Sequence, residues 1–143
     1  LPHQGTVFLS LADRDKDAGL LAARRFGELG FSIAATAGTA RDLEANGVRV
    51  DTVVAKVGED VGVDAVDLIS SGKVDLVVNT PRGRGPRADG GYIRLAANVH
   101  NVPCLTTAAA AIAAAGGIAD WARHGLSVRS LQEFHEEGQQ RLL

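Results

Sequence analysis

The chain has 143 residues, of which 45% are hydrophobic and 22% charged, a composition typical of one globular domain with a sizeable core. The formal net charge of −2 gives no electrostatic footprint for nucleic acid or a membrane surface, and no apolar run is long enough to span a bilayer. The single cysteine, Cys104, excludes an internal disulfide, which fits a cytoplasmic protein. Because methionine is absent, we expect a processed chain or a piece of a larger protein, with 1–4 as a linker or expression remnant and 5–143 as one domain.

The first half of the chain predicts strands that alternate with helices. The nearly continuous apolar run over 6–11 indicates a strand buried on both faces. Helical spacing follows over 20–29, and Gly30 stands where a helix ends. A second strand leads into the small-residue stretch 34–40, a short helix follows, and 48–55 alternates as a third strand.

The second half of the chain continues this alternation, with glycine-rich loops over 57–63 and 81–91. The predicted elements are a helix over 64–70, a strand over 74–78, a helix over 92–99, a strand over 102–105, an alanine-rich helix capped by Thr106, a short strand over 126–128 and a terminal helix over 131–143. Strands and helices at this spacing form right-handed parallel βαβ units. We therefore predict an α/β fold, with a parallel sheet covered by helices on both faces.

The stretch over 34–40 has the composition of an anion-binding site. It joins an apolar run to a segment with helical spacing, so backbone N–H groups at a helix start are expected to point outward. Thr36 and Thr39 add hydroxyl donors, and Gly38 lets the backbone approach a ligand closely. The alternative is that Thr39 merely caps the helix.

Polar side chains follow the predicted strands at their carboxyl ends, where ligands bind in open α/β sheets. Only three of the fifteen Lys and Arg residues are lysines, and two of these, Lys16 and Lys56, follow strands. Asn79 and Thr80 follow the fourth strand, and Thr106 follows the fifth. Compact ammonium groups at this edge indicate a phosphate held by point charges, whereas solvated surface lysines are the alternative.

Candidate catalytic groups are scarce in this sequence. The four histidines are scattered without metal-ligand spacing, and no serine or cysteine lies in a nucleophile-elbow pattern. Glu59 and Asp60 could reach the polar edge from their loop, but they have no visible partner for general base catalysis. We therefore predict no catalytic residue and no metal site.

Five motifs in series resemble one family. They are Leu9-Ser10 with Asp15-Lys16, and the segments 35–40, 55–57, 78–81 and 89–97. In this order and spacing the chain resembles the methylglyoxal-synthase-like domain, in the version found at the C-terminus of the large subunit of carbamoyl phosphate synthetase. The resemblance covers roughly residues 5–134 and implies a three-layer α/β/α fold with a five-stranded parallel sheet.

The resemblance implies a regulatory domain that itself needs no cofactor, within a parent ligase that uses ATP and magnesium. Such domains bind nucleotide monophosphates, UMP or IMP. They transmit the effect of this binding to the catalytic domains of an enzyme of pyrimidine and arginine biosynthesis. The implied partners are the other domains of the large chain, the glutaminase small subunit and a second copy, with no nucleic acid and no membrane. The implied effector-contacting positions are Lys16, Thr36, Gly38, Thr39, Lys56, Val57, Asn79, Thr80 and Ile93.

Departures from the family pattern leave the identity of the effector open. Pro81 replaces a threonine that binds effector in some members, and the loop before Asp64 is longer. Thr106 matches a position associated with ornithine activation, but the acid that precedes this position in the family is Leu105 here.

The main alternative is methylglyoxal synthase, which eliminates phosphate from dihydroxyacetone phosphate. That chemistry needs a carboxylate to move a proton and a histidine to polarise the carbonyl, yet the loop over 84–89 contains no histidine. A cyclohydrolase domain of purine synthesis shares only Gly38-Thr39-Ala40 with this chain. An interaction module with a vestigial site is a third alternative.

Overall fold

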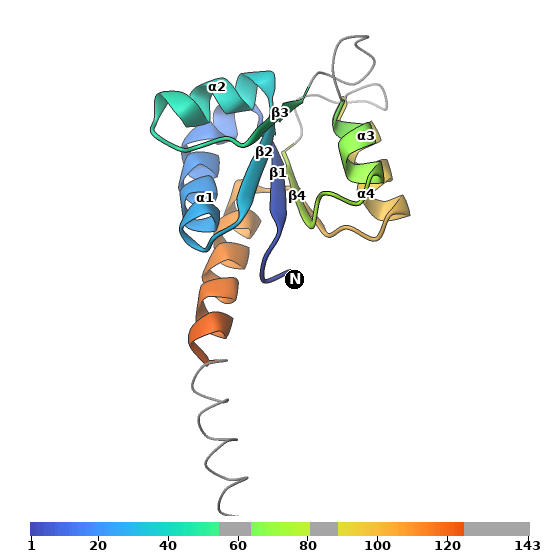
Figure 1. The fold of residues 1–143 in the computed structure, drawn as a ribbon. Helices are drawn as coiled ribbons and strands as arrows, with labels where there is room; N and C mark the ends of the chain where they lie inside the picture. Colours follow the sequence, from blue (N-terminus) through green and yellow to red (C-terminus); the bar gives the residue numbers. More distant parts are fainter. Residues whose placement is uncertain (55–63, 81–88, 125–143) are drawn as a thin grey trace, which may run out of the picture.

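The structure is a computed structural model that describes residues 1–54, 64–80 and 89–124. Its described elements form a sheet flanked by helices (Figure 1). In chain order they are β1 (Thr6–Ser10), the 3₁₀ helix η1 (Asp13–Asp15), α1 (Lys16–Glu28), β2 (Ser32–Thr36), α2 (Ala37–Ala45), β3 (Thr52–Val54), α3 (Ala65–Ser70), β4 (Leu76–Asn79), α4 (Asp89–Val99) and β5 (Cys104–Leu105). A further helix occupies 108–124, up to the last residue described there.

The five strands are all parallel and lie in the order β3-β2-β1-β4-β5. The central strand is β1, in which Leu9 pairs with Ala35 of β2 on one side and with Val78 of β4 on the other. The chain adds β2 and β3 in one direction and then crosses back to place β4 beside β1. The strand order therefore reverses next to β1, and the predicted five-stranded parallel sheet is confirmed.

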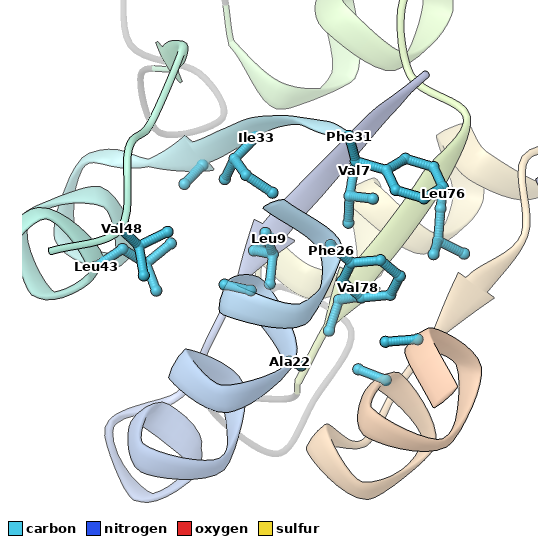
Figure 2. Packing of buried hydrophobic residues seen from close by; sticks show 14 of the residues in the cluster. Val7, Leu9, Ala22, Phe26, Phe31, Ile33, Leu43, Val48, Leu76 and Val78 are labelled. Atoms are coloured by element: carbon cyan, nitrogen blue, oxygen red, sulfur yellow. The ribbon is translucent and has the colours of Figure 1, made fainter. Parts of the chain in front are cut away.

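Both faces of the sheet are buried, which explains why its strands are apolar almost throughout. Val7 and Leu9 face α1, α2 and the helix over 108–124, in a cluster where Phe26 and Phe31 meet edge to face at 5.6 Å (Figure 2). Phe8 points to the opposite face, which α3 and α4 cover. This side-chain alternation along β1 gives the predicted three layers, helix, sheet and helix.

Two predicted helix ends are confirmed by their local geometry, and a third is corrected. Gly30 follows α1 with φ of +94°, a conformation that glycine adopts without a Cβ penalty. The Asp64 carboxylate accepts a hydrogen bond from the Asp67 N–H at 2.8 Å and so caps α3. The alanine-rich helix is capped by Thr107 rather than by Thr106, because the Thr107 hydroxyl accepts from the Ala110 N–H at 3.0 Å.

The third strand is shorter than the sequence predicted. The Val48 N–H donates to the Leu43 carbonyl at 2.9 Å, and Gly47 has φ of +83°, so these two residues close the end of α2. Pairing with β2 is therefore left to Thr52–Val54. The predicted strand over 126–128 and helix over 131–143 lie outside the described residues.

Two aspartates fasten the amino ends of neighbouring strands. Asp51 stands one residue before β3, and its carboxylate accepts from the Ile33 N–H of β2 at 2.9 Å while its own N–H donates to the Ile33 carbonyl at 2.8 Å. Asp75 repeats this arrangement before β4, with bonds of 2.8 and 2.9 Å to the N–H and carbonyl of Thr6 in β1. Each carboxylate continues the ladder of a parallel strand pair by one further acceptor.

Candidate functional site

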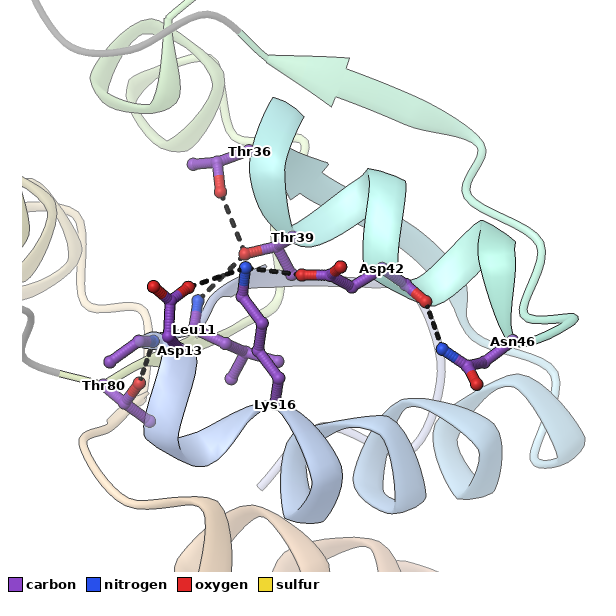
Figure 3. A network of polar contacts seen from close by, with 9 residues as sticks. Leu11, Asp13, Lys16, Thr36, Thr39, Asp42, Asn46 and Thr80 are labelled. Atoms are coloured by element: carbon purple, nitrogen blue, oxygen red, sulfur yellow. Dashed lines mark hydrogen bonds and ion pairs between the residues drawn. The ribbon is translucent and has the colours of Figure 1, made fainter.

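The carboxyl ends of β1, β2 and β4 meet beside the strand reversal, and several predicted site residues gather there. Thr36 ends β2, Asn79 ends β4 and Thr80 follows it directly. Lys16 begins α1, and Thr39 lies in the first turn of α2. Figure 3 shows Lys16, Thr36, Thr39 and Thr80 around the end of β1. Ligands of open α/β sheets bind at such a position.

The side chain of Thr39 lies at the centre of this edge and is fully buried. Its hydroxyl accepts a hydrogen bond from the Leu11 N–H at 3.0 Å and another from the Thr36 hydroxyl at 3.1 Å. These bonds tie the segment after β1 to the start of α2. The alternative that Thr39 caps the helix is wrong, because Thr36 occupies the N-cap position and makes no side-chain cap bond.

Thr80 fastens β4 to the same segment after β1. Its hydroxyl accepts from the Ala12 N–H at 2.7 Å, and its own N–H donates to the Ser10 carbonyl at 3.0 Å. Thr80 and Asn79 are both almost completely buried. These buried polar groups lie beneath the candidate site and hold the carboxyl ends of the three strands in place.

Lys16 is a charged residue that lies beside these buried polar groups. Its ammonium forms ion pairs with Asp13 of η1, at 2.9 Å, and with Asp42 of α2 (Figure 3). The hydrogen bond to Asp42, followed by that to Asp13, raises the pKa of Lys16 above its ordinary value. The lysine is therefore charged at neutral pH and held by two carboxylates.

Asp42 is a site residue that the sequence reasoning missed. It lies one helical turn after Thr39, so helical spacing alone would have placed both side chains on neighbouring positions of α2. Nothing in the sequence indicated that this face of α2 would meet Lys16, which belongs to another helix.

A small cavity lies beside Lys16, between α1 and α2. Its volume is about 130 Å³, below the roughly 300–1,000 Å³ of typical ligand pockets, so it has room for one small group rather than for a whole nucleotide. The lining residues are Leu11, Lys16, Asp17, Leu20, Thr39, Asp42, Leu43 and Asn46. Lys56 and Val57, two further predicted contact positions, lie outside the described residues.

The remaining predicted positions are dispersed around the sheet. Gly38 lies in the first turn of α2, and an added Cβ there would meet no atom within 4 Å, so the backbone is open to a ligand. Ile93 is buried under α4 against the opposite face of the sheet, in the cluster of Phe8. Thr106 follows β5 and is exposed.

Two larger cavities, of about 620 and 500 Å³, lie near the amino ends of the strands. Both include Ser32 and Asp51, and neither contains any of the predicted site residues. Ligands in open α/β sheets bind at the carboxyl edge, so volume alone does not make these cavities the candidate site.

Among the described residues, neither Cys104 nor any group of metal-binding side chains forms a candidate site. Burial raises the pKa of the Cys104 thiol, with an opposing effect from the charge of Arg94, which fits the prediction of a small hydrophobic residue rather than a nucleophile. Within 1–54, 64–80 and 89–124, no three His, Cys, Asp or Glu side chains cluster to hold a metal ion. Among the same residues, no helix has the length and apolar character to cross a membrane.

The fold and the threonine-lined edge define a class of protein, and comparison with known families identifies it. The family model of the MGS-like domain matches residues 19–106. The chain therefore belongs to the MGS-like domain family, as its five motifs had predicted.

Similar curated proteins are much longer than this chain. It is 50% identical over 136 residues to the carbamoyl phosphate synthase large chain of Rubrobacter xylanophilus. Over 141 residues it is 47% identical to the large chain of Mycobacterium tuberculosis and 48% identical to that of Streptomyces avermitilis. These alignments cover 94%, 94% and 95% of this chain but only 13% of each relative. The chain thus spans about an eighth of the length of the relatives it matches.

Proposed function

We propose that this chain is the regulatory domain of a carbamoyl phosphate synthase large chain and that it binds a nucleotide monophosphate of the UMP or IMP type. The observation that carries the proposal is the polar edge beside the strand reversal, where Lys16 and the start of α2 lie together in an MGS-like domain. Large chains with 46–50% identity support the parent enzyme.

The phosphate of the effector would bind at the start of α2. The first N–H groups of a helix have no partner within the helix and favour an anion, and Thr36 does not cap them. Gly38 leaves the backbone open there, and Lys16 lines the small cavity between α1 and α2 together with Thr39. Lys56 would add a second countercharge, and Asn79 would fix the ribose or base.

The function of this binding would be regulatory coupling rather than catalysis. An effector changes activity only when it favours one arrangement of the neighbouring domains, typically by about 1–3 kcal/mol. The partners would be the ATP- and magnesium-dependent domains of the same large chain, the glutaminase small subunit and a second copy. The setting would be the cytoplasm, in the synthesis of pyrimidines and arginine.

Calorimetry with UMP and IMP tests this proposal, first on this chain and then on the full-length large chain. Replacing Lys56→Ala removes one charged contact, worth about 1.5–3 kcal/mol, so we expect the affinity to fall roughly tenfold or more. Lys73→Ala is the matched control, because Lys73 lines a cavity at the amino edge and should leave binding unchanged.

Two results would contradict the proposal. One is the absence of binding heat for both nucleotides with the chain and with the full-length protein. The other is formation of methylglyoxal from dihydroxyacetone phosphate by this chain, which would make it an enzyme in its own right.

A further inference from the structure

The ammonium of Lys16 already has anionic partners where the proposed phosphate would bind. Asp42 contacts it from α2, and Asp13 contacts it from η1 at 2.9 Å. The side chain of Lys16 is only 24% exposed, that of Asp42 is 46% exposed and that of Asp13 is 97% exposed. Asp42 is thus the better shielded of the two carboxylates and holds the lysine from inside the cavity.

The charges around this cavity oppose an incoming anion. Its titratable lining consists of Lys16, Asp17 and Asp42, so one cation stands against two carboxylates. A phosphate monoester that approached Lys16 would meet the Asp42 carboxylate, and like charges in such proximity repel each other. The phosphate and Asp42 cannot both take the same side of the ammonium.

We propose that Asp42 competes with the phosphate of the effector for Lys16, so that this ion pair must open before a phosphate monoester binds. The inference rests on the proposed function, because it concerns the same site. Asp42 belongs to α2, and Lys16 begins α1, so opening the pair removes a direct tie between two helices. The Thr39 hydroxyl still holds α2 to the segment after β1, at 3.0 Å from the Leu11 N–H.

The competition makes the site selective for ligands that carry a doubly charged phosphate group. A singly charged carboxylate would only replace one carboxylate by another and gain little. A phosphate dianion offers more charge and more acceptor oxygens to Lys16 and to the start of α2. Asp42 therefore discriminates against ligands whose negative charge is too small to displace its carboxylate from Lys16.

The test compares Asp42→Asn with Glu44→Gln in titrations with inorganic phosphate and with UMP at low ionic strength. Both variants remove one negative charge from α2, but Glu44 is exposed and does not line the cavity. We expect Asp42→Asn to bind inorganic phosphate roughly two- to fivefold more tightly, as loss of one partly exposed ion pair allows, and Glu44→Gln to match the parent chain. Melting curves check that each variant is folded.

A double variant tests whether the gain in phosphate affinity depends on Lys16. With Lys16→Met present, Asp42→Asn should bring a clearly smaller gain, because only the direct repulsion between Asp42 and phosphate is then removed, and an undiminished gain would overturn the inference. Unchanged or weaker phosphate binding in Asp42→Asn would overturn the inference, and so would an equal gain in Glu44→Gln.

The same titrations separate this inference from the proposed function. UMP binding that is equal in the parent chain and in Asp42→Asn would support the function and overturn the competition. Phosphate binding that emerges only in Asp42→Asn, with no nucleotide bound by the parent chain or by the full-length protein, would support the competition and overturn the function. Failure of every variant to bind either ligand would overturn both.

Discussion

At the scale of single residues, the hydroxyl groups of the candidate site stabilise the fold itself. Thr39 is fully buried and accepts from the Leu11 N–H, and Thr80 accepts from the Ala12 N–H at 2.7 Å. Both bonds hold the segment after β1 against residues from other elements. A substitution at either threonine therefore changes stability as well as any ligand contact, and the two effects have to be measured separately.

We expect Thr39→Val to lower the free energy of unfolding by about 1–3 kcal/mol, because it deprives the buried Leu11 N–H of this acceptor. Thr36→Val is the matched control, since it removes only a hydroxyl that donates to Thr39, and it should cost less. Urea unfolding followed by circular dichroism measures both values. Equal losses of unfolding free energy in the two variants would show that the bond from the Leu11 N–H does not account for the contribution of Thr39 to stability.

At the scale of elements, the strands are aligned by side chains that lie before them. Asp51 and Asp75 each occupy the position before a strand and bond both backbone groups of a residue in the neighbouring strand. Gly5 is required beside Asp75, because its φ is +121° and an added Cβ would lie 1.9 Å from the carboxylate oxygen. The register of the sheet is thus supported at the edge opposite the candidate site.

The two aspartates allow a test of how burial affects the stability that a carboxylate bond contributes. Asp51→Ala should destabilise the protein by about 1.5–3 kcal/mol, because its bond to the Ile33 N–H is partly buried and involves a charged acceptor. Asp75→Ala should cost less, since the Thr6 N–H is exposed and water can replace the carboxylate. Thermal or urea unfolding of both variants checks this order, and the reverse order would show that solvent access does not determine the cost.

At the scale of the whole molecule, the three layers leave the carboxyl edge of the sheet as the place where separate segments converge. Helices α1, α2 and the helix over 108–124 cover one face, and α3 and α4 cover the other (Figure 1). The segments after β1, β2 and β4 are joined by the hydroxyls of Thr39 and Thr80. A ligand at this edge therefore touches parts of the chain that are far apart in sequence.

Cys104 offers a probe of global opening because it is the single thiol of the chain. Burial raises its pKa, so at pH 8 we expect iodoacetamide to alkylate it more slowly than a cysteine in a short peptide. Urea above the unfolding transition should abolish the difference. A native rate equal to that of the peptide would show that the edge strand β5 opens readily.

The same shift predicts how Cys104 affects stability at alkaline pH. A thiol whose pKa is raised by folding keeps its proton in the native state while the unfolded chain begins to ionise near the ordinary value of 9.0. Its contribution to stability therefore declines as the pH rises above that value. Cys104→Ala should weaken the decline in unfolding free energy above pH 9, which urea unfolding at several pH values measures.

The sequence by itself determined the class of fold and the edge that carries the candidate site. Apolar runs such as 6–11 require burial on both faces, and helical spacing between them requires parallel βαβ units. Polar residues such as Asn79 and Thr80 directly after a strand then have to lie at the carboxyl edge. These features are local, so residue order was sufficient to predict them.

The tertiary structure alone decided what the polar residues at that edge contact. Thr39 meets the Leu11 N–H across 28 positions of sequence, and Thr80 meets the Ala12 N–H across 68. The pairing of Lys16 with Asp42 likewise depends on how α1 and α2 pack on the sheet. Periodicity fixes which face of a helix is buried, but the partner of a polar side chain depends on the relative placement of separate elements, which only the packed core defines.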